Sequence, residues 1–291
     1  MNNTKPDYKI VDSPPWVLRV AHFLQKKGIR GGHHLEAAAR SRGLLDVLVR
    51  VKLNRDVRID VPAYNDSYNL SDIRHYEYKL INLISSRISR TDEPFLLLDC
   101  GADIGLFSAL LVSACEGVQE VIAFEPNVRS YGHLTSNLEL LPIKAEAKNM
   151  AVADFHGTGE LRFPDHDSHN HAAFIVPSEQ GDIQVIKIDE LGLPDSHRIL
   201  CKIDVEGGEL AVVKGALKTL SSSSEFAVIF EAHPEQVKRV GIDPLEVVSL
   251  LGSIRSCKAV VAEAPDREID FSCSFFQQFP DRVHNICVFS E

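Results

Sequence analysis

The stretch Phe95-Leu-Leu-Leu-Asp-Cys-Gly-Ala-Asp-Ile-Gly-Leu-Phe107 decides the fold of this chain. Its first four residues are apolar, as in a strand whose two faces are both covered. Asp99 ends this run, and Gly101 and Gly105 supply a turn in which the backbone can approach another group closely. Apolar residues at helical spacing follow from Ile104 to Cys115. The stretch therefore predicts a strand, a glycine turn and a helix, and open α/β sheets bind their ligands at such turns.

The spacing of the glycines favours one kind of ligand. A dinucleotide fingerprint has the pattern Gly-x-Gly-x-x-Gly, which seats a pyrophosphate on a helix N-terminus. Here the pattern is Gly101-x-x-x-Gly105, with Asp99 and Asp103 in or beside the turn. Two carboxylates would repel a pyrophosphate, but they suit the amine and sulfonium of S-adenosylmethionine. Glu125 follows a second apolar strand, Val121–Phe124, where an acid can accept both ribose hydroxyls. The alternative is an ordinary strand-turn-helix unit with a capping Asp, which Glu125 disfavours.

Composition sets the outer limits. The chain has 291 residues with 44% hydrophobic content, enough for one large α/β domain and an extension. Its formal charge of −10 argues against a nucleic-acid or anionic-membrane surface, because both need clustered Lys and Arg. The modestly basic stretch Arg40–Arg58 is expected to be a solvated helix face. No segment has the ~20 apolar residues of a membrane span. The polar residues 1–15 contain no apolar signal core, which predicts a cytoplasmic protein.

Residues 1–71 are expected to form a helical extension that caps the main domain and helps to bind the acceptor. Apolar residues recur at three- and four-residue spacing in Trp16–Lys27 and in Leu35–Lys52. Gly31–His34, between these segments, is predicted to be a loop. Arg58–Val61 has the composition of a short strand.

Residues 72–291 are expected to form a single domain. Asp72–Arg90 is predicted to be one amphipathic helix, and from Phe95 onward strands and helices alternate, which indicates a parallel sheet with helices on both faces. Ala145–Val152 is predicted to be the third strand. Hairpins are expected between His156 and Ile188, and their histidine-rich tip, Asp165–His171, is interpreted as an exposed loop or lid. The six cysteines form no Cys-x-x-Cys pair, which favours buried free thiols.

Polar side chains recur where two further strands end. One strand covers Ile199–Ile203 and the other Phe226–Phe230. The side chains that follow them are Asp204, Glu206, Glu231 and His233. Because the carboxyl ends of parallel strands share one edge of a sheet, we expect these groups to lie near Asp99 and Glu125. The alternative is that the acids only cap the helices that follow, which is our interpretation of Glu209.

Five motifs in this order resemble those of the FkbM-type methyltransferases. They are Asp99-Cys-Gly-Ala-Asp-Ile-Gly105, Phe124-Glu-Pro-Asn127, Ala151-Val152, Lys187-Ile-Asp-Glu-Leu191 and Lys202-Ile-Asp-Val-Glu-Gly-Gly-Glu209. The resemblance covers roughly residues 72–233. It implies a Rossmann-like class I methyltransferase fold with a mostly parallel seven-stranded sheet, and O-methylation of a sugar, glycan or glycosylated natural product. Asp103 stands where Asn is usual in the family, and Gly208 stands where Ala is common.

The resemblance also implies S-adenosylmethionine as the cofactor. The residues expected to bind it are Asp99, Gly101, Ala102, Asp103, Gly105, Glu125, Pro126, Asn127, Ala151, Val152 and Asp204. The methionine end is expected at Asp99–Gly105, and the ribose at Glu125.

A sugar hydroxyl is weakly acidic, so its methylation needs a general base or a metal that lowers its pKa. The candidate catalytic residues are Asp204, Glu206, Glu231 and His233, and His233 is the favoured base. Mg²⁺ or Mn²⁺ bound by Asp204, Glu231 and His233 remains open, although we favour a reaction without metal. The competing interpretations are a catalytically silent cofactor-binding scaffold and an NAD-dependent oxidoreductase. The missing dinucleotide fingerprint opposes the second.

Overall fold

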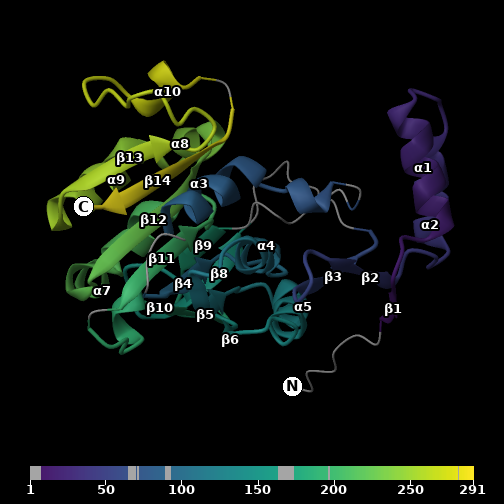
Figure 1. Cartoon of the computed structure of the whole chain (residues 1–291), viewed down its shortest axis with the longest axis horizontal. Helices are drawn as coiled ribbons and strands as arrows, with labels where there is room; N and C mark the ends of the chain where they lie inside the picture. Colours follow the sequence, from purple (N-terminus) through teal and green to yellow (C-terminus); the bar gives the residue numbers. More distant parts are fainter. Residues whose placement is uncertain are drawn as a thin grey trace.

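A seven-stranded sheet forms the centre of the molecule (Figure 1). The computed structural model describes residues 8–64, 70, 72–88, 93–162, 174–195, 197–280 and 282–291. The strand order is β13-β14-β12-β11-β4-β5-β6. The strands are β4 (Phe95–Cys100), β5 (Val118–Phe124), β6 (Lys144–Lys148), β11 (Arg198–Ile203), β12 (Glu225–Ala232), β13 (Cys257–Val261) and β14 (His284–Ser290). Neighbours from β12 to β6 are parallel, and β14 is antiparallel to β12 and β13. The prediction of a mostly parallel seven-stranded α/β sheet is confirmed.

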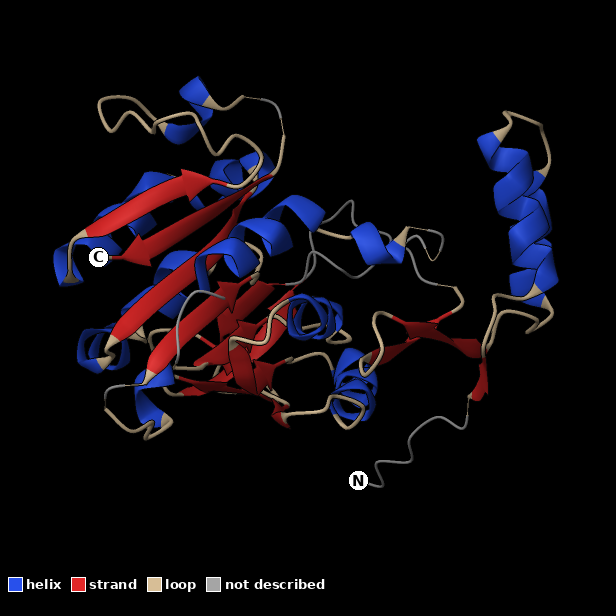
Figure 2. Ribbon diagram, viewed as in Figure 1, coloured by secondary structure: helices blue, strands red, loops and turns tan. Residues whose placement is uncertain are grey.

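Helices cover both faces of this sheet (Figure 2). One face packs into a core with α3 (Tyr78–Ile88), α4 (Leu106–Ala114) and α5 (Val128–Leu138). The other face packs with α6 (Glu209–Lys214), α7 (Leu217–Ser222), α9 (Pro244–Ile254) and α10 (Phe275–Gln278). Leu97 belongs to the first core and Leu98 to the second, and both are fully buried. β4 is therefore covered on both faces, as its unbroken apolar run predicts.

A second sheet of four strands lies beside the first. It contains β7 (Ala151–Val152), β8 (Gly157–Arg162), β9 (Phe174–Pro177) and β10 (Ile183–Ile186) in the order β7-β10-β8-β9. The antiparallel pairs β8–β9 and β8–β10 confirm the predicted hairpins. The prediction of one strand over Ala145–Val152 is wrong, because β6 ends at Lys148 and β7 joins the second sheet. Between them, the Asn149 side chain donates to the carbonyls of Glu125 and Pro126. Asp165–His171 lies outside the described residues.

The N-terminal region is not purely helical. It contains β1 (Lys9–Val11), α1 (Trp16–Lys26), α2 (Gly32–Ser41), β2 (Val47–Lys52) and β3 (Arg58–Pro62). The predicted helix over Leu35–Lys52 is wrong beyond Ser41, because residues 47–52 alternate with the period of a strand and pair with β1 and β3. Gly31–His34 is not a loop throughout, since α2 begins at Gly32. The short strand predicted at Arg58–Val61 is confirmed as β3.

The hairpin of β2 and β3 is built into the main domain. Ile59 and Val61 of β3 are fully buried in the same core as Leu97 of β4. The backbone N–H of Asp60 donates to Oδ1 of Asn137 on α5, at 2.8 Å. By contrast, α1 and α2 stand away from the body of the molecule (Figure 1). None of the helices in the described ranges has the length and apolar character needed to cross a bilayer.

The helix predicted over Asp72–Arg90 is interrupted. A short 3-10 helix, η1 (Ile73–His75), comes first, and α3 begins at Tyr78. Glu77, between them, has φ +47°, a left-handed conformation that stops an α-helix. This interruption sets the position of the Glu77 side chain.

Candidate active site

The glycine turn after β4 is in direct contact with the end of β11. Gly101 has φ +81°, and a Cβ placed on it would lie 1.9 Å from the carbonyl oxygen of Asp204. The backbone N–H of Asp204 donates to the carbonyl of Cys100 at 2.9 Å. Glycine is therefore required at position 101 because the backbone of Asp204, directly after β11, lies so close to it. As a result, the two strand ends form one continuous rim.

Glu125 organises the turn from the neighbouring strand. Its Oε2 accepts the backbone N–H of Asp103 at 2.8 Å, and its Oε1 accepts that of Asn127 at 2.8 Å. Burial raises the pKa of Glu125 to about 8, although the two N–H donors act in the opposite direction. Each carboxylate oxygen has a second lone pair, so Glu125 can still accept a ligand hydroxyl. Asp103 itself has φ +46°, which Asn and Asp tolerate better than most residues.

Asp99 lies in β4, two residues before Gly101, and connects this strand to α4. Its side chain is 1% exposed, and its Oδ2 accepts a hydrogen bond from Ser108 Oγ on α4 at 2.5 Å. Burial raises the pKa of Asp99 to about 6, and the Ser108 hydroxyl opposes this shift. At the start of α4 the N-cap is Gly105, which makes no side-chain cap hydrogen bond. The first N–H groups of this helix therefore remain suited to an anionic group of a ligand.

Of the remaining residues expected to bind the cofactor, Ala102 belongs to this turn, Asn127 is bonded to Glu125 beside it, and Ala151 and Val152 lie in the second sheet. Ala102 is buried, and its N–H donates to the carbonyl of Phe124. Asn127, which follows Pro126, caps α5 by accepting the N–H of Arg129 at 3.0 Å. Ala151 and Val152 are buried in β7. Sequence reasoning missed Asn149, which holds the loop after β5 through two carbonyls.

Lys202 is a buried cation at the end of β11. Its side chain is 3% exposed, and its Nζ donates to Asp204 Oδ2 at 3.0 Å. The parallel register pairs Lys202 with Asp99 of β4 and, one residue past the last pair, brings Asp204 beside Glu231 of β12. Burial alone would lower the pKa of Lys202, but the carboxylates around it hold that pKa well above its ordinary value. Lys202 is therefore charged, and it gathers acids from several elements.

Glu77 is the acid in this group that sequence reasoning missed. Its Oε2 is buried and has no hydrogen-bond partner among the described residues. Burial raises the pKa of Glu77 to about 7; Lys202 opposes the shift, and Asp204 and Asp99 add to it. The sequence carries a weak signal at best, because Glu77 lies within a segment that has the apolar spacing of a continuous helix.

Glu231 belongs to the same group, whereas Glu206 is attached to α8 (Pro234–Val240). Burial raises the pKa of Glu231 to about 8, and Asp204 adds to the shift. Glu206 Oε2 accepts a hydrogen bond from Gln236 of α8 at 2.8 Å, and the Glu206 carbonyl accepts one from Arg239. Burial raises the pKa of Glu206 to about 7. The structure thus brings Asp204 and Glu231 together and gives Glu206 a separate set of partners.

His233 is the N-cap of α8. Its Nδ1 accepts the backbone N–H of Glu235 at 3.1 Å, and burial lowers the pKa of its imidazole. A neutral imidazole that accepts at Nδ1 carries its hydrogen on Nε2. His233 in this position has no free nitrogen with which to accept a proton.

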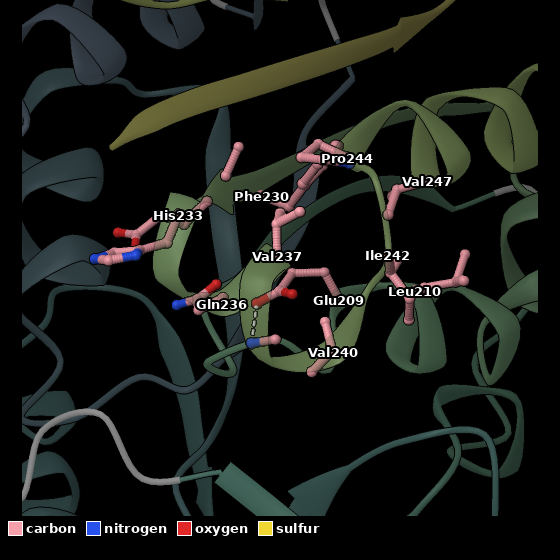
Figure 3. Close-up of a pocket in the computed structure, with 13 residues that line it drawn as sticks. Glu209, Leu210, Phe230, His233, Gln236, Val237, Val240, Ile242, Pro244 and Val247 are labelled. Carbon is pink, nitrogen blue, oxygen red and sulfur yellow. Dashed lines mark hydrogen bonds between the residues drawn. The ribbon is translucent and has the colours of Figure 1, made fainter. Parts of the chain in front are cut away.

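Next to His233 is a mostly apolar pocket between β12, α6, α8 and α9 (Figure 3). Leu210, Phe230 and Val237 line it, Glu209 points into it, and His233 lies at its edge. Glu209 Oε1 accepts the backbone N–H of Gly207, which lies before the N-cap Gly208, so this bond holds the turn that leads into α6. No residue of the turn Asp99–Gly105 lines this pocket, but Glu231 does, so the pocket adjoins the acidic group rather than the turn itself. Within the described ranges, no three His, Cys, Asp or Glu side chains are grouped so that they could hold a metal ion.

A groove with several basic side chains lies between the N-terminal strands and η1. Its lining includes Lys52, Arg58, Arg74 and His75. Arg50, which also lines it, makes a bidentate ion pair with Asp60, at 2.8 and 2.7 Å. Asp12 also lines the groove, but the cations outnumber it and suit an anionic ligand.

Comparison with known proteins gives a consistent result. The family model described as "Methyltransferase FkbM domain" matches residues 99–261. Hexuronic acid methyltransferase AglP of Haloferax volcanii is 26% identical over 206 residues, which are 68% of this chain and 77% of that protein. The crystal structure of methyltransferase FkbM from Methylobacillus flagellatus KT is 19% identical with a TM-score of 0.44. That match covers 67% of this chain and 43% of the other, so this chain spans less than half of that structure. For M. jannaschii TYW2 in complex with AdoMet, the identity is 12%, the TM-score 0.40 and the coverage 83% and 84%.

Proposed function

The chain belongs to the FkbM methyltransferase family, and from this premise we propose that it transfers a methyl group from S-adenosylmethionine to a hydroxyl of a sugar in a glycan or glycosylated small molecule. The observation that carries the proposal is the buried Lys202 with the partly buried acids Asp204, Glu231 and Glu77 around it, beside the glycine turn. A scaffold that only bound the cofactor would have no use for such costly buried charges. In open α/β sheets, the reacting groups meet at this edge.

The residues of the turn fit the cofactor. Glu125 retains acceptor capacity for the ribose hydroxyls, and the uncapped start of α4 suits the carboxylate of the methionine end. When bound, the cofactor supplies an electrophilic methyl group. The task of the chain is then to hold the acceptor oxygen in line with that group, exclude water and receive a proton.

We place the general base among the carboxylates of this group. The pKa of Glu77 lies at about 7 and that of Glu231 at about 8, which is the range in which proton transfer near neutral pH is efficient. His233, the base favoured by sequence reasoning, already uses Nδ1 to cap α8. Lys202 positions the carboxylates, because it donates to Asp204 and offsets the negative charge around it.

For the acceptor we propose an acidic sugar. A curated relative is named a hexuronic acid methyltransferase, and the groove on the N-terminal region contains the exposed cations Lys52, Arg58 and Arg74. A sugar carboxylate in this groove would pair with these cations. A neutral sugar would leave them without a partner.

The test is methyl transfer from isotope-labelled S-adenosylmethionine to oligosaccharides that end in a uronic acid, with matched neutral oligosaccharides beside them. We expect transfer to the acidic series, and a raised KM for that series when Lys52 and Arg74 are both replaced by alanine. Lys218→Ala, a change of an exposed lysine on α7, is the control. The same assay in the presence of a chelator shows whether methyl transfer needs Mg²⁺ or Mn²⁺. Cofactor binding in calorimetry without transfer to either series would favour the silent scaffold, and binding of NAD instead would favour the oxidoreductase.

A further inference from the structure

The hairpin formed by α1 and α2 exposes an apolar face of the kind that soluble surfaces normally avoid. Val17, Leu18 and Ala21 form the buried side of α1. On the opposite side Trp16 is 67% exposed, Val20 40% and Phe23 58%. Positions i, i+4 and i+7 share one face of a helix, so these three side chains form a continuous stripe. The hairpin stands away from the main body (Figure 1), and the exposed fractions show that no described residue covers this stripe.

The same hairpin is basic in an acidic protein. Residues 16–45 contain six Lys and Arg but one acid, Glu36, which gives +5 and leaves −15 for the rest of the chain. Arg19 and Lys26 are exposed on α1 and flank the stripe, and further exposed cations follow at Lys27, Arg30 and Arg42. Among the residues that the structure describes, none of these five cations forms an ion pair. The net charge of −10 conceals this cluster, which is why sequence reasoning argued against an anionic membrane surface.

We propose that the outward face of α1 docks on the surface of an anionic lipid bilayer. Trp and Phe flanked by Lys and Arg are typical of helices that lie in the headgroup region with the apolar face inward. A second copy is a poorer occupant, because two such faces packed together would bring like charges together. The acidic remainder of the chain would be repelled by the same lipids, which orients the hairpin toward the membrane.

Trp16 allows a direct test, because it is the only tryptophan in the chain. The full-length protein is mixed with phosphatidylcholine vesicles that contain or lack phosphatidylserine, and Trp16 emission is followed. We expect a blue shift and co-sedimentation with the anionic vesicles alone, and both should weaken in high salt. No blue shift with anionic vesicles would overturn the proposal. A blue shift that grows with protein concentration in the absence of lipid would overturn it in favour of a second copy.

Matched variants separate the stripe from its cations. Each Lys or Arg near an anionic surface is worth about a fivefold change in partition, so Arg19→Glu with Lys26→Glu should lower vesicle binding by at least about 25-fold. Phe23→Ala should weaken binding without changing its salt dependence. The controls are Lys218→Glu and Phe271→Ala, since Phe271 is 58% exposed, as Phe23 is, but lies outside the hairpin. If the control variants lost as much vesicle binding as the variants in the hairpin, the outward face of α1 would not be a specific docking face.

Discussion

At the scale of single residues, the site depends on the charge of Lys202. Carboxylates removed from water are costly unless a cation or hydrogen-bond donors compensate them. Lys202 is buried, donates to Asp204 and interacts with Glu77, Asp99 and Glu231, so one ammonium group serves several acids. Burial raises the pKa of Glu77 and of Glu231. The neighbouring carboxylates add to this rise, because one ammonium group does not neutralise all of them.

Lys202→Met should therefore destabilise the fold as well as the site. The variant keeps most of the side-chain volume but leaves Asp204 and its neighbours without their cation, and breaking a buried pair in this way typically costs about 3–5 kcal/mol. Urea unfolding followed by circular dichroism measures the change. Lys218→Met, at an exposed position, should shift the midpoint little. A loss below about 1 kcal/mol, the value of a surface pair, would mean that Lys202 is not the compensating charge.

Glu125→Ala should reduce affinity for S-adenosylmethionine at least tenfold. The change removes an acceptor for two ribose hydroxyls, and at about 0.5–1.5 kcal/mol for each hydrogen bond the loss of both accounts for a tenfold change. It also releases the N–H groups of Asp103 and Asn127 that order the turn. Isothermal titration calorimetry gives the affinity. Glu120→Ala is the control, since this acid lies on the same strand but pairs with the surface residue Lys144. Unchanged affinity in Glu125→Ala would remove this residue from the cofactor site.

Replacement of His233 by asparagine separates capping from base catalysis. Asparagine is a good N-cap, so His233→Asn should keep α8 intact and retain turnover within a few fold. Glu231→Gln should lower turnover by about 10²–10⁴-fold, the usual contribution of a general base. Steady-state kinetics at saturating cofactor compare the two. If His233→Asn lost as much as Glu231→Gln, the imidazole would be the base after all.

Several residues of the site can be predicted from the sequence because they interrupt apolar strands. Asp99, Glu125 and Asp204 each follow a buried run, and parallel strands bring such ends together. Glu77 and the cap role of His233 could not be predicted in this way. The first depends on a left-handed residue inside a helical pattern, and the second on a backbone hydrogen bond.

At the scale of elements, β3 ties the N-terminal region to the main domain. Ile59 and Val61 are buried with the residues of β4, and Asn137 of α5 bonds both the N–H and the carbonyl of Asp60. The boundary that sequence reasoning set after residue 71 would cut through this core. The alternation of residues 47–52 was available in the sequence, but its apolar positions also fit helical spacing, and pairing with β3 decides the outcome.

Two truncations test where the domain begins. Residues 46–291 keep β2 and β3, so this fragment should stay folded and bind S-adenosylmethionine as the whole chain does. Residues 72–291 lose the buried β3 side chains, and each large apolar truncation in a core costs about 2–5 kcal/mol, so this fragment should be much less stable. Thermal unfolding and calorimetry measure both properties. A stable 72–291 fragment with full cofactor affinity would restore the boundary at residue 72.

At the scale of the whole molecule, charge is segregated. The hairpin of α1 and α2 is basic, while the remainder carries a net charge of −15 and holds the acids Asp99, Glu125 and Glu231 at the ends of β4, β5 and β12, where burial raises their pKa values. These buried acids, together with Glu77, bind protons more tightly in the folded chain than in the unfolded chain. Stability should therefore depend on pH in a direction that the raised pKa values fix.

Between about pH 6.5 and pH 8 the ligand-free protein should lose stability as the pH rises. Glu231 and Glu125, with ordinary pKa values of 4.5, have folded values of about 8, so the unfolded chain has released these protons while the folded chain still holds them. The free energy of unfolding therefore falls with each pH unit of rise in this window, until Glu231 and Glu125 ionise in the folded chain near pH 8. His233 and His284 have lowered pKa values, so they make stability rise with pH. Their effect is confined to pH values below about 6.5, the ordinary pKa of histidine. Thermal unfolding across the window should show a falling midpoint. Glu231→Gln should flatten the slope and the surface change Glu120→Gln should leave it, whereas a midpoint that rises with pH would show that these acids are ionised in the folded protein.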